Sequence, residues 1–526
     1  MTINRFFLPL LVGTFGIILA WLGTPVFIPD SYEQAIVAEC WRYDTSSRMD
    51  CANIFPWFRP PLPSLLITPW IDWIDSFTAI LLLSWLAVVS TIGIIVHRTL
   101  FYFHSESSSR WIALTLTLTL SLAGLITDLG LLADSKTIAL PLVFGAGNLF
   151  LSHKQTLGKS IGAGILLGLA FLTRFENLLL IVSGFGLVLL ISKRQRWHHL
   201  LAYGLGCVPF VGGWIWLLRE TTGRWTLSPR YWEQWILLLI DEMPLRWVQE
   251  LYGMGIWNPP LRTVALQSNL HQPSGGLLDT FNLWEWLDWL NMNILSLFHP
   301  IVVLIFLGSL LLWIGEQSMR RWMCVLLWIS LPSIAVTVLP QGRESIFPVA
   351  YVLPMWCAVW IWIGLSVGLL LVRIESLSKW IYLLGLIGIS QLPTSIHPPD
   401  NIALLPVSMT AQHWIRSYTP KNSIILSSFE IAPIVWLSER QWQEWHSPFE
   451  ANLRIPNLQK EHPAIYGLVA EFDHHAWYSL SFEERYYEPV AYIHNGKSSF
   501  LLFDFSPVIE EQETFAPFEL EEFEMP

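Results

Sequence analysis

Carboxylate and guanidinium side chains recur beside the ends of long apolar segments in this chain. The set consists of Asp30, Glu33, Arg59, Asp134, Arg174, Glu176, Arg343 and Glu344. A carboxylate can accept the proton of an attacking hydroxyl or amine. An arginine can pair two oxygens of one phosphate through its planar fork. Together, these residue types could move a group from a phosphate leaving group to an acceptor.

The composition indicates that these residues belong to a membrane protein. Of the 526 residues, 53% are hydrophobic and 13% are charged, whereas soluble domains average about 25% charged residues. A chain this apolar must bury its surface in something other than its own core, and lipid is the obvious candidate. The 30 Trp residues agree, because indole rings favour the headgroup interface. The net charge of −11 argues against a nucleic-acid partner.

Eleven apolar segments are candidates for spanning helices, each of which needs about 20 residues. They lie near 6–24, 77–97, 111–132, 137–152, 160–174, 177–192, 200–218, 299–315, 322–340, 347–371 and 379–393. The sequence that follows the first segment is a poor cleavage site for a signal peptide, so we expect this segment to be retained as a helix. The fold class is therefore a polytopic α-helical membrane protein.

The basic residues of the short loops predict the orientation. With the N-terminus in the cytoplasm, every short cytoplasmic loop is basic and the opposite loops lack this pattern, as the positive-inside rule requires. The cytoplasmic set is Arg98, Arg110, Lys154, Lys159, Lys193, Arg194, Arg196, Arg320, Arg321, Arg373 and Lys379. Three large parts then lie outside: the loops 25–76 and 219–298, and the chain from residue 394. Every carboxylate and arginine of the first set falls on this outer side.

The C-terminal part changes character. Short apolar runs with β-branched residues occur at 423–427, 464–470 and 500–505, and these are typical of strands. Residues 394–508 are therefore predicted to form a small extracytoplasmic α/β domain behind a transmembrane module, 1–393. The acidic tail, 509–526, reads as solvated and disordered. The Trp-rich loop 219–298 has the pattern of amphipathic helices that lie in the interface.

Each charged residue also has a purely structural alternative. Asp30 and Glu33 fit a capping box, with Asp30 as the N-cap, and Asp134 could cap the helix that follows it. Arg59 could simply precede a helix whose first turn is set by proline. Arg174 could snorkel to lipid headgroups.

Cysteine and histidine give little sign of a metal site. Cys40 and Cys51 share the first outer loop, where they form either a disulfide or two free thiols. Asp473, His474 and His475 are adjacent, but neighbouring histidines in a loop are more often surface residues. We predict no metal ligands.

Taken in order, the charged motifs resemble those of the GT-C membrane glycosyltransferases that use polyprenyl-phosphate sugars. This group includes the protein O-mannosyltransferases and the lipid A aminoarabinose transferases, and the resemblance is to glycosyltransferase family 39. Pro29-Asp30-Ser31-Tyr32-Glu33 stands where the family has an acidic motif at a helix start, often Asp-Glu-x-x-Tyr. Arg59-Pro60-Pro61-Leu62 matches the basic-Pro-Pro-Leu motif before the second span.

Three further positions extend the resemblance. Asp134 matches an acidic residue at the outer end of the third span, and Arg343 matches a late arginine loosely. The pattern Gly-Leu-Ala-x-Leu-Thr-Arg-x-Glu appears at 168–176, with Phe175 where the family usually has Pro. The motifs cover residues 1–190 well, and the remainder of the chain only by topology.

The resemblance implies an inverting transfer of sugar from a polyprenyl-phosphate carrier to a lipid, protein or glycan acceptor on the periplasmic side of a bacterial inner membrane. Asp30 looks like the general base and Glu33 a displaced second acid. Arg59, Arg174 and Arg343 would bind the donor phosphate. Asp134 and Glu176 would orient the acceptor or hold the arginines. No organic cofactor is expected, and the need for a divalent cation is left open.

Other classes of function remain as alternatives. A lipid-linked polysaccharide polymerase or ligase would depend on arginines in a large outer loop, and the segment 219–298 contains Arg219, Arg224, Arg230, Arg246 and Arg262. A transporter would carry charged residues at mid-bilayer and paired broken helices, which the clustering at the outer interface disfavours. A scaffold role is the third alternative.

Overall fold

The computed structural model describes the following part of the chain: residues 26–27, 29–43, 60–74, 76–102, 115, 132–133, 135–152, 155–191, 196–222, 317–338, 348–373, 415–427, 435, 438, 440–444, 455, 458–460, 462–470, 481–482, 485–486, 489–494 and 499–506. The chain divides into two compact units. One comprises residues 1–35, 56–232 and 277–397, and the other 36–55, 233–276 and 398–526. Each unit is described by itself.

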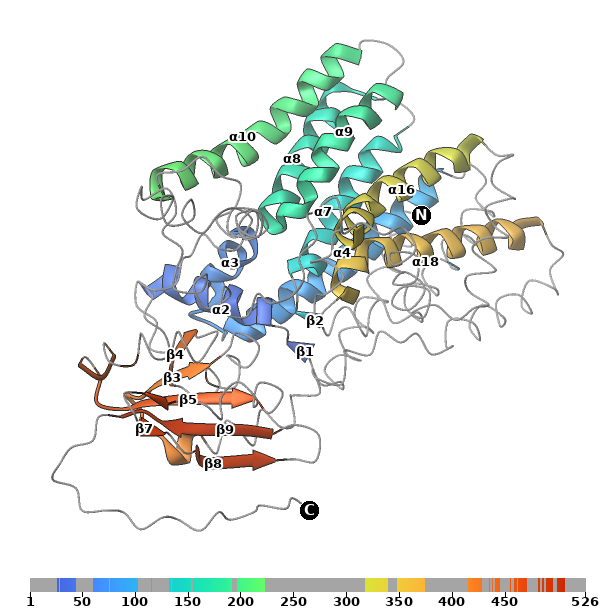
Figure 1. The fold of residues 1–526 in the computed structure, drawn as a ribbon. Coiled ribbons are helices and arrows are strands. Elements are labelled where there is room, and N and C mark those ends of the chain that lie inside the picture. The colour runs from blue at the N-terminus through green and yellow to red at the C-terminus, as the bar shows by residue number, and fades with distance from the viewer. Residues whose placement is uncertain are drawn as a thin grey trace, which may run out of the picture. The chain divides into compact units, whose positions relative to one another are not determined.

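Long helices form the described part of the first unit (Figure 1). They are α4 (Ser76–Tyr102), α7 (Ser135–Phe150), α8 (Leu157–Thr173), α9 (Leu178–Ile191), α10 (Arg196–Thr222), α16 (Gln317–Val338) and α18 (Pro348–Arg373). Each coincides with a predicted span. The predicted spans 6–24, 111–132, 299–315 and 379–393 lie outside the described residues, apart from Thr115. The count of eleven therefore stays a prediction.

Two of the described helices are long and apolar enough to cross a membrane by length and composition, Thr78–Thr99 within α4 and Arg196–Glu220 within α10. Four shorter apolar helices accompany them, Leu157–Thr173, Phe175–Leu190, Arg321–Ile334 and Leu353–Leu369. α10 continues to Thr222, so the first residues of the predicted outer loop 219–298 extend this helix instead.

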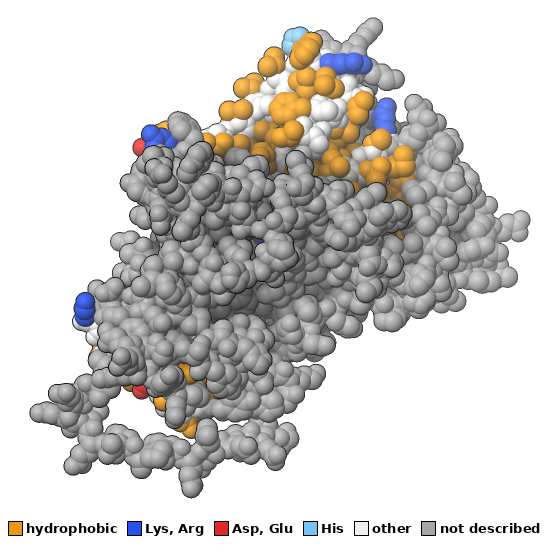
Figure 2. Space-filling view, viewed as in Figure 1, with side chains coloured by type: hydrophobic (Ala, Val, Ile, Leu, Met, Phe, Trp, Pro, Cys, Tyr) orange, Lys and Arg blue, Asp and Glu red, His pale blue; other side chains and the backbone are white. Residues whose placement is uncertain are grey.

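The helices are apolar on their outward faces as well as in their core. Hydrophobic side chains gather over the part of the surface where α8, α9 and α10 lie (Figure 2). Examples with more than half of the side chain exposed are Val182, Leu190, Leu201, Leu205 and Val208. Helices that are hydrophobic all round need an apolar medium around them, as expected of a membrane protein.

Close contact between α8 and α10 fixes the centre of this unit. A Cβ atom added at Gly164 of α8 would overlap the carbonyl oxygen of Tyr203 on α10. One added at Gly206 of α10 would overlap the carbonyl oxygen of Ile161. Small residues allow two backbones to approach this closely in membrane helices. Because α8 ends at Thr173, this contact also fixes the position of the next residue, Arg174.

The first outer loop forms short elements. β1 (Val26–Phe27) precedes α2 (Pro29–Tyr43), and α3 (Leu62–Ile67) leads into the 3-10 helix η1 (Thr68–Trp70). Because α2 begins at Pro29, Asp30 lies inside the first helical turn and is not the N-cap that the capping-box interpretation predicted. Proline at the first helical position has the φ angle that a helix needs and lacks only an N–H that would have no partner there.

The second unit contains a mixed sheet in the order β4-β3-β5-β9-β8. Its strands are β3 (Ile424–Ser427), β4 (Gln441–Glu444), β5 (Ile465–Ala470), β8 (Pro489–His494) and β9 (Ser499–Asp504). β3 pairs in parallel with β4 and β5, while β9 is antiparallel to β5 and β8. A separate hairpin joins β6 (Ser481–Phe482) to β7 (Arg485–Tyr486). The three apolar runs predicted as strands correspond to β3, β5 and β9.

Both faces of this sheet are buried, which explains why the runs are continuous and not alternating. Ile425 and Leu468 belong to one apolar cluster, and Ile424 and Phe503 to the other. The bounds of the predicted domain, 394–508, and its place outside the membrane stay predictions, as does the disordered tail.

Cys40 of α2 is disulfide-bonded. Cys207, Cys324 and Cys357 are reduced thiols, and the fifth cysteine, Cys51, lies outside the described residues. The partner of Cys40 lies outside the described residues, and its identity as Cys51 stays a prediction.

Candidate active site

An ion pair occupies the break between α8 and α9. Arg174 has an extended backbone, with φ −152° and ψ 122°, and the 3-10 turn η2 (Phe175–Asn177) follows it. Its Nη2 lies 2.6 Å from Oε1 of Glu176. The two side chains are 9% and 17% exposed. The predicted Arg174 and Glu176 are thus brought together, in a turn that is largely protected from solvent.

The residues of the turn hold this pair in place. The backbone N–H of Arg174 and the side-chain amide of Asn177 both donate to the carbonyl of Ala170, each at 2.9 Å. These bonds satisfy a carbonyl at the helix end that would otherwise lack a partner. Phe175 packs against Phe171 and Trp214, with ring centroids 5.4 and 5.8 Å apart. The Phe that replaces the expected Pro therefore anchors the turn to α8 and α10.

The start of α7 contacts the same pair. Nη1 of Arg174 donates to Oγ of Ser135 at 3.3 Å. Lys136, the next residue, is only 9% exposed, and its charge acts on Glu176. Lys136 was not among the site residues predicted from the sequence. The feature that could have identified Lys136 is its position in the first turn of a helix. A cation is disfavoured there, so a buried lysine at that position implies a nearby anion.

Glu176 lies in the connection between the helices, and its environment sets its charge. Burial by itself raises the pKa of the carboxyl group, but the charge of Arg174, a backbone hydrogen bond and the charge of Lys136 lower it. The net pKa is below the ordinary value. Glu176 is therefore an ionised counter-ion between two cations, which makes it a poor proton acceptor. Of its two predicted roles, the geometry favours holding the arginine over orienting the acceptor.

A short parallel ladder brings the segments of Asp30 and Asp134 together. Val26 and Phe27 of β1 pair with Leu132 and Ala133 of β2 (Leu132–Ala133). Asp134 follows directly after β2 and precedes Ser135, while Asp30 lies in the first turn after β1. Paired strands run about 5 Å apart. The ladder therefore places the starts of α2 and α7 near each other, and Ser135 at the start of α7 contacts Arg174.

A second link joins α2 to the segment that follows Arg59. Nε2 of Gln34 donates to the carbonyl of Pro60 at 3.4 Å, and Oγ of Ser64 donates to Oε1 of Gln34 at 2.5 Å. Gln34 and Ser64 are both buried. Because Gln34 adjoins Glu33 and Pro60 adjoins Arg59, these bonds hold the two motif segments against each other.

The structure describes some of the predicted site residues and leaves others outside its described part. Arg174 and Glu176 form a direct pair, and Asp30 and Glu33 lie on the first turns of α2, where their side chains are outside the described part. Three further residues, Arg59, Asp134 and Arg343, lie outside the described residues altogether. Within the described ranges, no group of three or more His, Cys, Asp or Glu could hold a metal ion. The Asp473-His474-His475 stretch falls outside those ranges.

Comparison with known proteins gives matches to solved structures only. No protein-family model matches the sequence, and no curated protein matches it significantly. ArnT from Cupriavidus metallidurans in the apo state superposes with a TM-score of 0.54 at 10% identity, covering 95% of this chain and 97% of ArnT. ArnT bound to undecaprenyl phosphate gives a TM-score of 0.45 at 11% identity, with the same coverage.

The oligosaccharyltransferase of Archaeoglobus fulgidus in the apo form gives a TM-score of 0.47 at 13% identity, covering 91% of this chain and 71% of that one. Of these three structures, apo ArnT has a TM-score above 0.5, and the fold assignment depends on it. The chain has the fold of ArnT over nearly its whole length, and the predicted resemblance to the GT-C glycosyltransferases is confirmed at the level of the fold.

Proposed function

We propose that this chain is a membrane glycosyltransferase that moves a sugar from a polyprenyl-phosphate carrier to an acceptor on the periplasmic side, with inversion at the anomeric carbon. One observation carries the proposal. Arg174 is held between Glu176 and Ser135, and Ser135 is the residue that follows Asp134, in a chain with the fold of ArnT. ArnT is itself a polyprenyl-phosphate-linked glycosyl transferase.

The chemistry begins with proton removal from the acceptor. Asp30 acts as general base on the acceptor hydroxyl or amine. The acceptor's oxygen or nitrogen then attacks the anomeric carbon as the bond from that carbon to the phosphate oxygen breaks. Glu33, one turn further along α2, is the second acid of the motif. A position on the first turn of a helix suits an anionic base, because the helix dipole favours the ionised carboxylate there.

The leaving phosphate gains charge during the reaction, from about −1 in the diester towards −2. Cations placed on it therefore bind the transition state more strongly than the ground state, which raises turnover. Arg59, Arg174 and Arg343 take this role. Lys136 joins them, because it is buried beside the same turn. The negative charge of Glu176 offsets the repulsion between the positive charges of Arg174 and Lys136.

Two features support a reaction on the outer side of the membrane. Every residue of the set falls on the predicted outer side, and Cys40 on α2 is disulfide-bonded, as is usual in oxidising compartments. The Trp-rich loop 219–298 would cover the acceptor, and Asp134 would orient it. A lipid, a protein or a glycan acceptor fits this chemistry equally. The membrane that we propose is a bacterial inner membrane. No organic cofactor enters the proposal.

The test is a transfer assay with purified full-length protein and labelled polyprenyl-phosphate sugars. Asp30→Asn should lower the turnover rate by roughly 100- to 10,000-fold, the usual share of general base catalysis, while binding of the donor lipid is retained. Arg224→Gln and Arg246→Gln in the outer loop are the matched variants, because a polymerase or ligase would depend on them. Full transfer by Asp30→Asn together with loss of transfer in the loop variants would replace this proposal with that alternative.

A further inference from the structure

An apolar stripe lies on the exposed face of the segment between Arg59 and α4. In this segment α3 runs into η1, and the helical hydrogen bonding continues to Ile74, because the N–H groups of Trp73 and Ile74 both donate to the carbonyl of Trp70, at 2.9 and 3.0 Å. The exposed apolar side chains follow helical spacing and so share one face. These side chains, which we call the outer stripe, are Leu65, Leu66, Pro69, Trp70 and Trp73.

The opposite face of the same segment is packed and held in place. Ser64 and Ile67 are buried. Oγ of Ser64 donates to Oε1 of Gln34 on α2 at 2.5 Å, and Oγ1 of Thr68 donates to the carbonyl of Ser64 at 2.7 Å. α3 also contacts α4 and α8. The segment cannot turn the outer stripe inward without breaking these contacts, so the stripe faces whatever surrounds the first unit.

The two tryptophans indicate what that medium is. Trp70 and Trp73 are 52% and 79% exposed, and their rings meet edge to face, with centroids 5.9 Å apart and an interplanar angle of 85°. Soluble surfaces rarely leave large apolar side chains exposed together. An indole ring has an apolar body and one polar N–H group, and it favours the boundary between lipid headgroups and acyl chains. The outer stripe therefore has the chemistry of that boundary.

The residues beside the stripe set its depth. A single residue separates Ile74 from α4, which is long and apolar enough to cross a membrane. Leu86 on α4 is itself 59% exposed, so the stripe leads into a helix surface that suits acyl chains. Asp72 lies within the turn that carries the two tryptophans and is exposed. A carboxylate is costly in hydrocarbon, which keeps this turn at the interface and out of the bilayer core.

We propose that the outer stripe is an interfacial anchor whose partner is the bilayer leaflet on the side of the candidate active site, with Trp70 and Trp73 as the anchoring side chains. Through the bond between Ser64 and Gln34, the anchor fixes the depth of α2 and of the segment that follows Arg59. The proposal concerns where this segment lies in the membrane. It does not depend on the proposed sugar transfer, and it is tested without an activity assay.

The experiment measures depth in proteoliposomes of the full-length protein. An environment-sensitive fluorescent amino acid replaces Trp73, and its quenching is compared between phosphatidylcholine brominated near the headgroup end of the acyl chains and phosphatidylcholine brominated near their methyl ends. Quenching at position 73 should be about twofold stronger with bromine near the headgroups. The proposal is overturned if neither lipid quenches the probe, as expected in water or against a second protein chain, or if bromine near the methyl ends quenches it more.

Position 86 on α4 is the matched reference for this measurement. Leu86 lies ten residues beyond Ser76, about 15 Å along the helix at 1.5 Å per residue, which is about half the thickness of the hydrocarbon core. The same probe in place of Leu86 should be quenched more strongly by bromine near the methyl ends. An equal preference at positions 73 and 86 would contradict an anchor at the interface.

A second set of variants tests whether the tryptophans do the anchoring. The probe replaces Leu66, another member of the outer stripe. Trp70→Ser combined with Trp73→Ser should lower its quenching by lipid about twofold, whereas Trp70→Tyr with Trp73→Tyr should retain it, because tyrosine also favours the interface. Tyr418→Ser is the control, since Tyr418 is an exposed aromatic residue of the second unit. Unchanged quenching in the serine pair would show that the tryptophans are not the anchor.

Discussion

Arg174 shows how a charged group can be fixed at the end of an apolar helix. Its fork is shared between the carboxylate of Glu176 and the hydroxyl of Ser135, and its backbone is tied to the last turn of α8. An arginine prepared in this way does not need to reorganise when charge develops on a leaving phosphate. A lysine could supply the charge but not the planar geometry.

Glu176 gives the first prediction, which concerns pH. Its pKa is lower in the folded protein than its ordinary value of 4.5, so its stabilisation is present above that pH and is lost as pH falls through the folded value. Glu176→Gln should have a lower Tm than the wild type at pH 7, by about 2–4 °C. That gap should shrink below pH 4.5.

The measurement is thermal unfolding in detergent at a series of pH values. Glu220→Gln is a suitable comparison, because Glu220 is an exposed carboxylate near the C-terminal end of α10. Its Tm should follow the wild type throughout. A gap between wild type and Glu176→Gln that stays constant down to pH 3 would show that the ionised carboxylate does not stabilise the turn.

At the scale of elements, the packing of α8 against α10 determines where the site lies. Gly164 and Gly206 meet the opposite backbone, and Phe175 continues the contact by packing on Trp214 of α10. The turn of Arg174 is thus an extension of a helix pair that leaves no space between its backbones. A substitution that separates α8 from α10 should therefore displace the turn of Arg174, although it alters no charged residue.

A pair of glycine substitutions on α10 tests this dependence. Gly206→Ala should lower the Tm by several degrees and reduce transfer, because its Cβ would overlap the carbonyl of Ile161. Gly213→Ala on the same helix meets no atom within 4 Å, and alanine favours a helix over glycine, so its Tm should be unchanged or higher. Equal Tm values for the two variants would contradict the close crossing.

The sequence predicted the elements better than their contacts. Apolar length is a local property, so α4, α10 and α18 were predicted close to their observed bounds, and buried strands such as β5 appeared as unbroken apolar runs. The ladder of β1 and β2 was not predictable, because each strand has only two residues and their partner is a hundred residues away. The predicted start of α2 was wrong by two residues, because an N-cap at Asp30 makes Ser31 the first helical residue, whereas the helix begins at Pro29.

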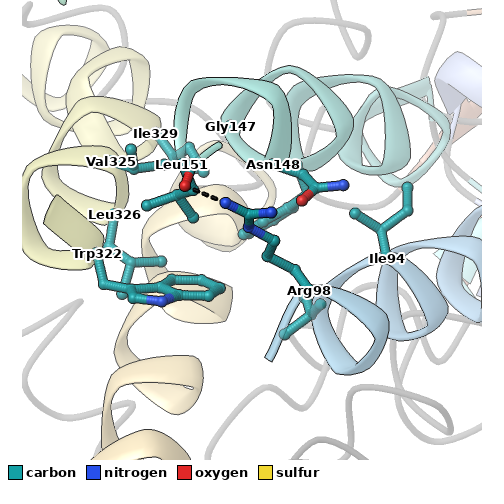
Figure 3. A pocket seen from close by; sticks show the side chains of 11 residues that line it. Ile94, Arg98, Gly147, Asn148, Leu151, Trp322, Val325, Leu326 and Ile329 are labelled. Carbon is teal, nitrogen blue, oxygen red and sulfur yellow. Dashed lines mark hydrogen bonds between the residues drawn. The ribbon is translucent and has the colours of Figure 1, made fainter. Parts of the chain in front are cut away.

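The same distinction applies to the site. Arg174 and Glu176 were predicted from one short motif and form a pair within it. Lys136 was missed, because its nearness to Glu176 arises from the meeting of α7 with the α8–α9 turn, which sequence spacing does not show. The pocket that Arg98 lines between α4, α7 and α16 (Figure 3) was likewise hidden, since it is built from three helices that are distant along the chain.

At the scale of the whole molecule, the first unit has different chemistry at its two ends. The end that holds Arg174 carries the carboxylate of Glu176 and the charge of Lys136 beside short strands and turns, whereas the opposite end carries Arg98 in a pocket lined mostly by apolar side chains. Between them the helices present apolar side chains outward. A lipid-linked donor suits this arrangement, because its phosphate would meet the charged end while its polyprenyl chain remains along the apolar helices.

The most direct test of the account is single-turnover transfer by the full-length protein in proteoliposomes, comparing wild type with Arg174→Lys and Arg174→Gln. The account predicts a rate constant roughly 10- to 100-fold lower for Arg174→Lys and lower still for Arg174→Gln, with donor affinity changed less than the rate, because the guanidinium acts chiefly on the charge that develops in the transition state. If both variants transferred sugar at the wild-type rate, or lost only donor affinity, Arg174 would not stabilise a leaving phosphate and the proposed reaction centre would be in the wrong place.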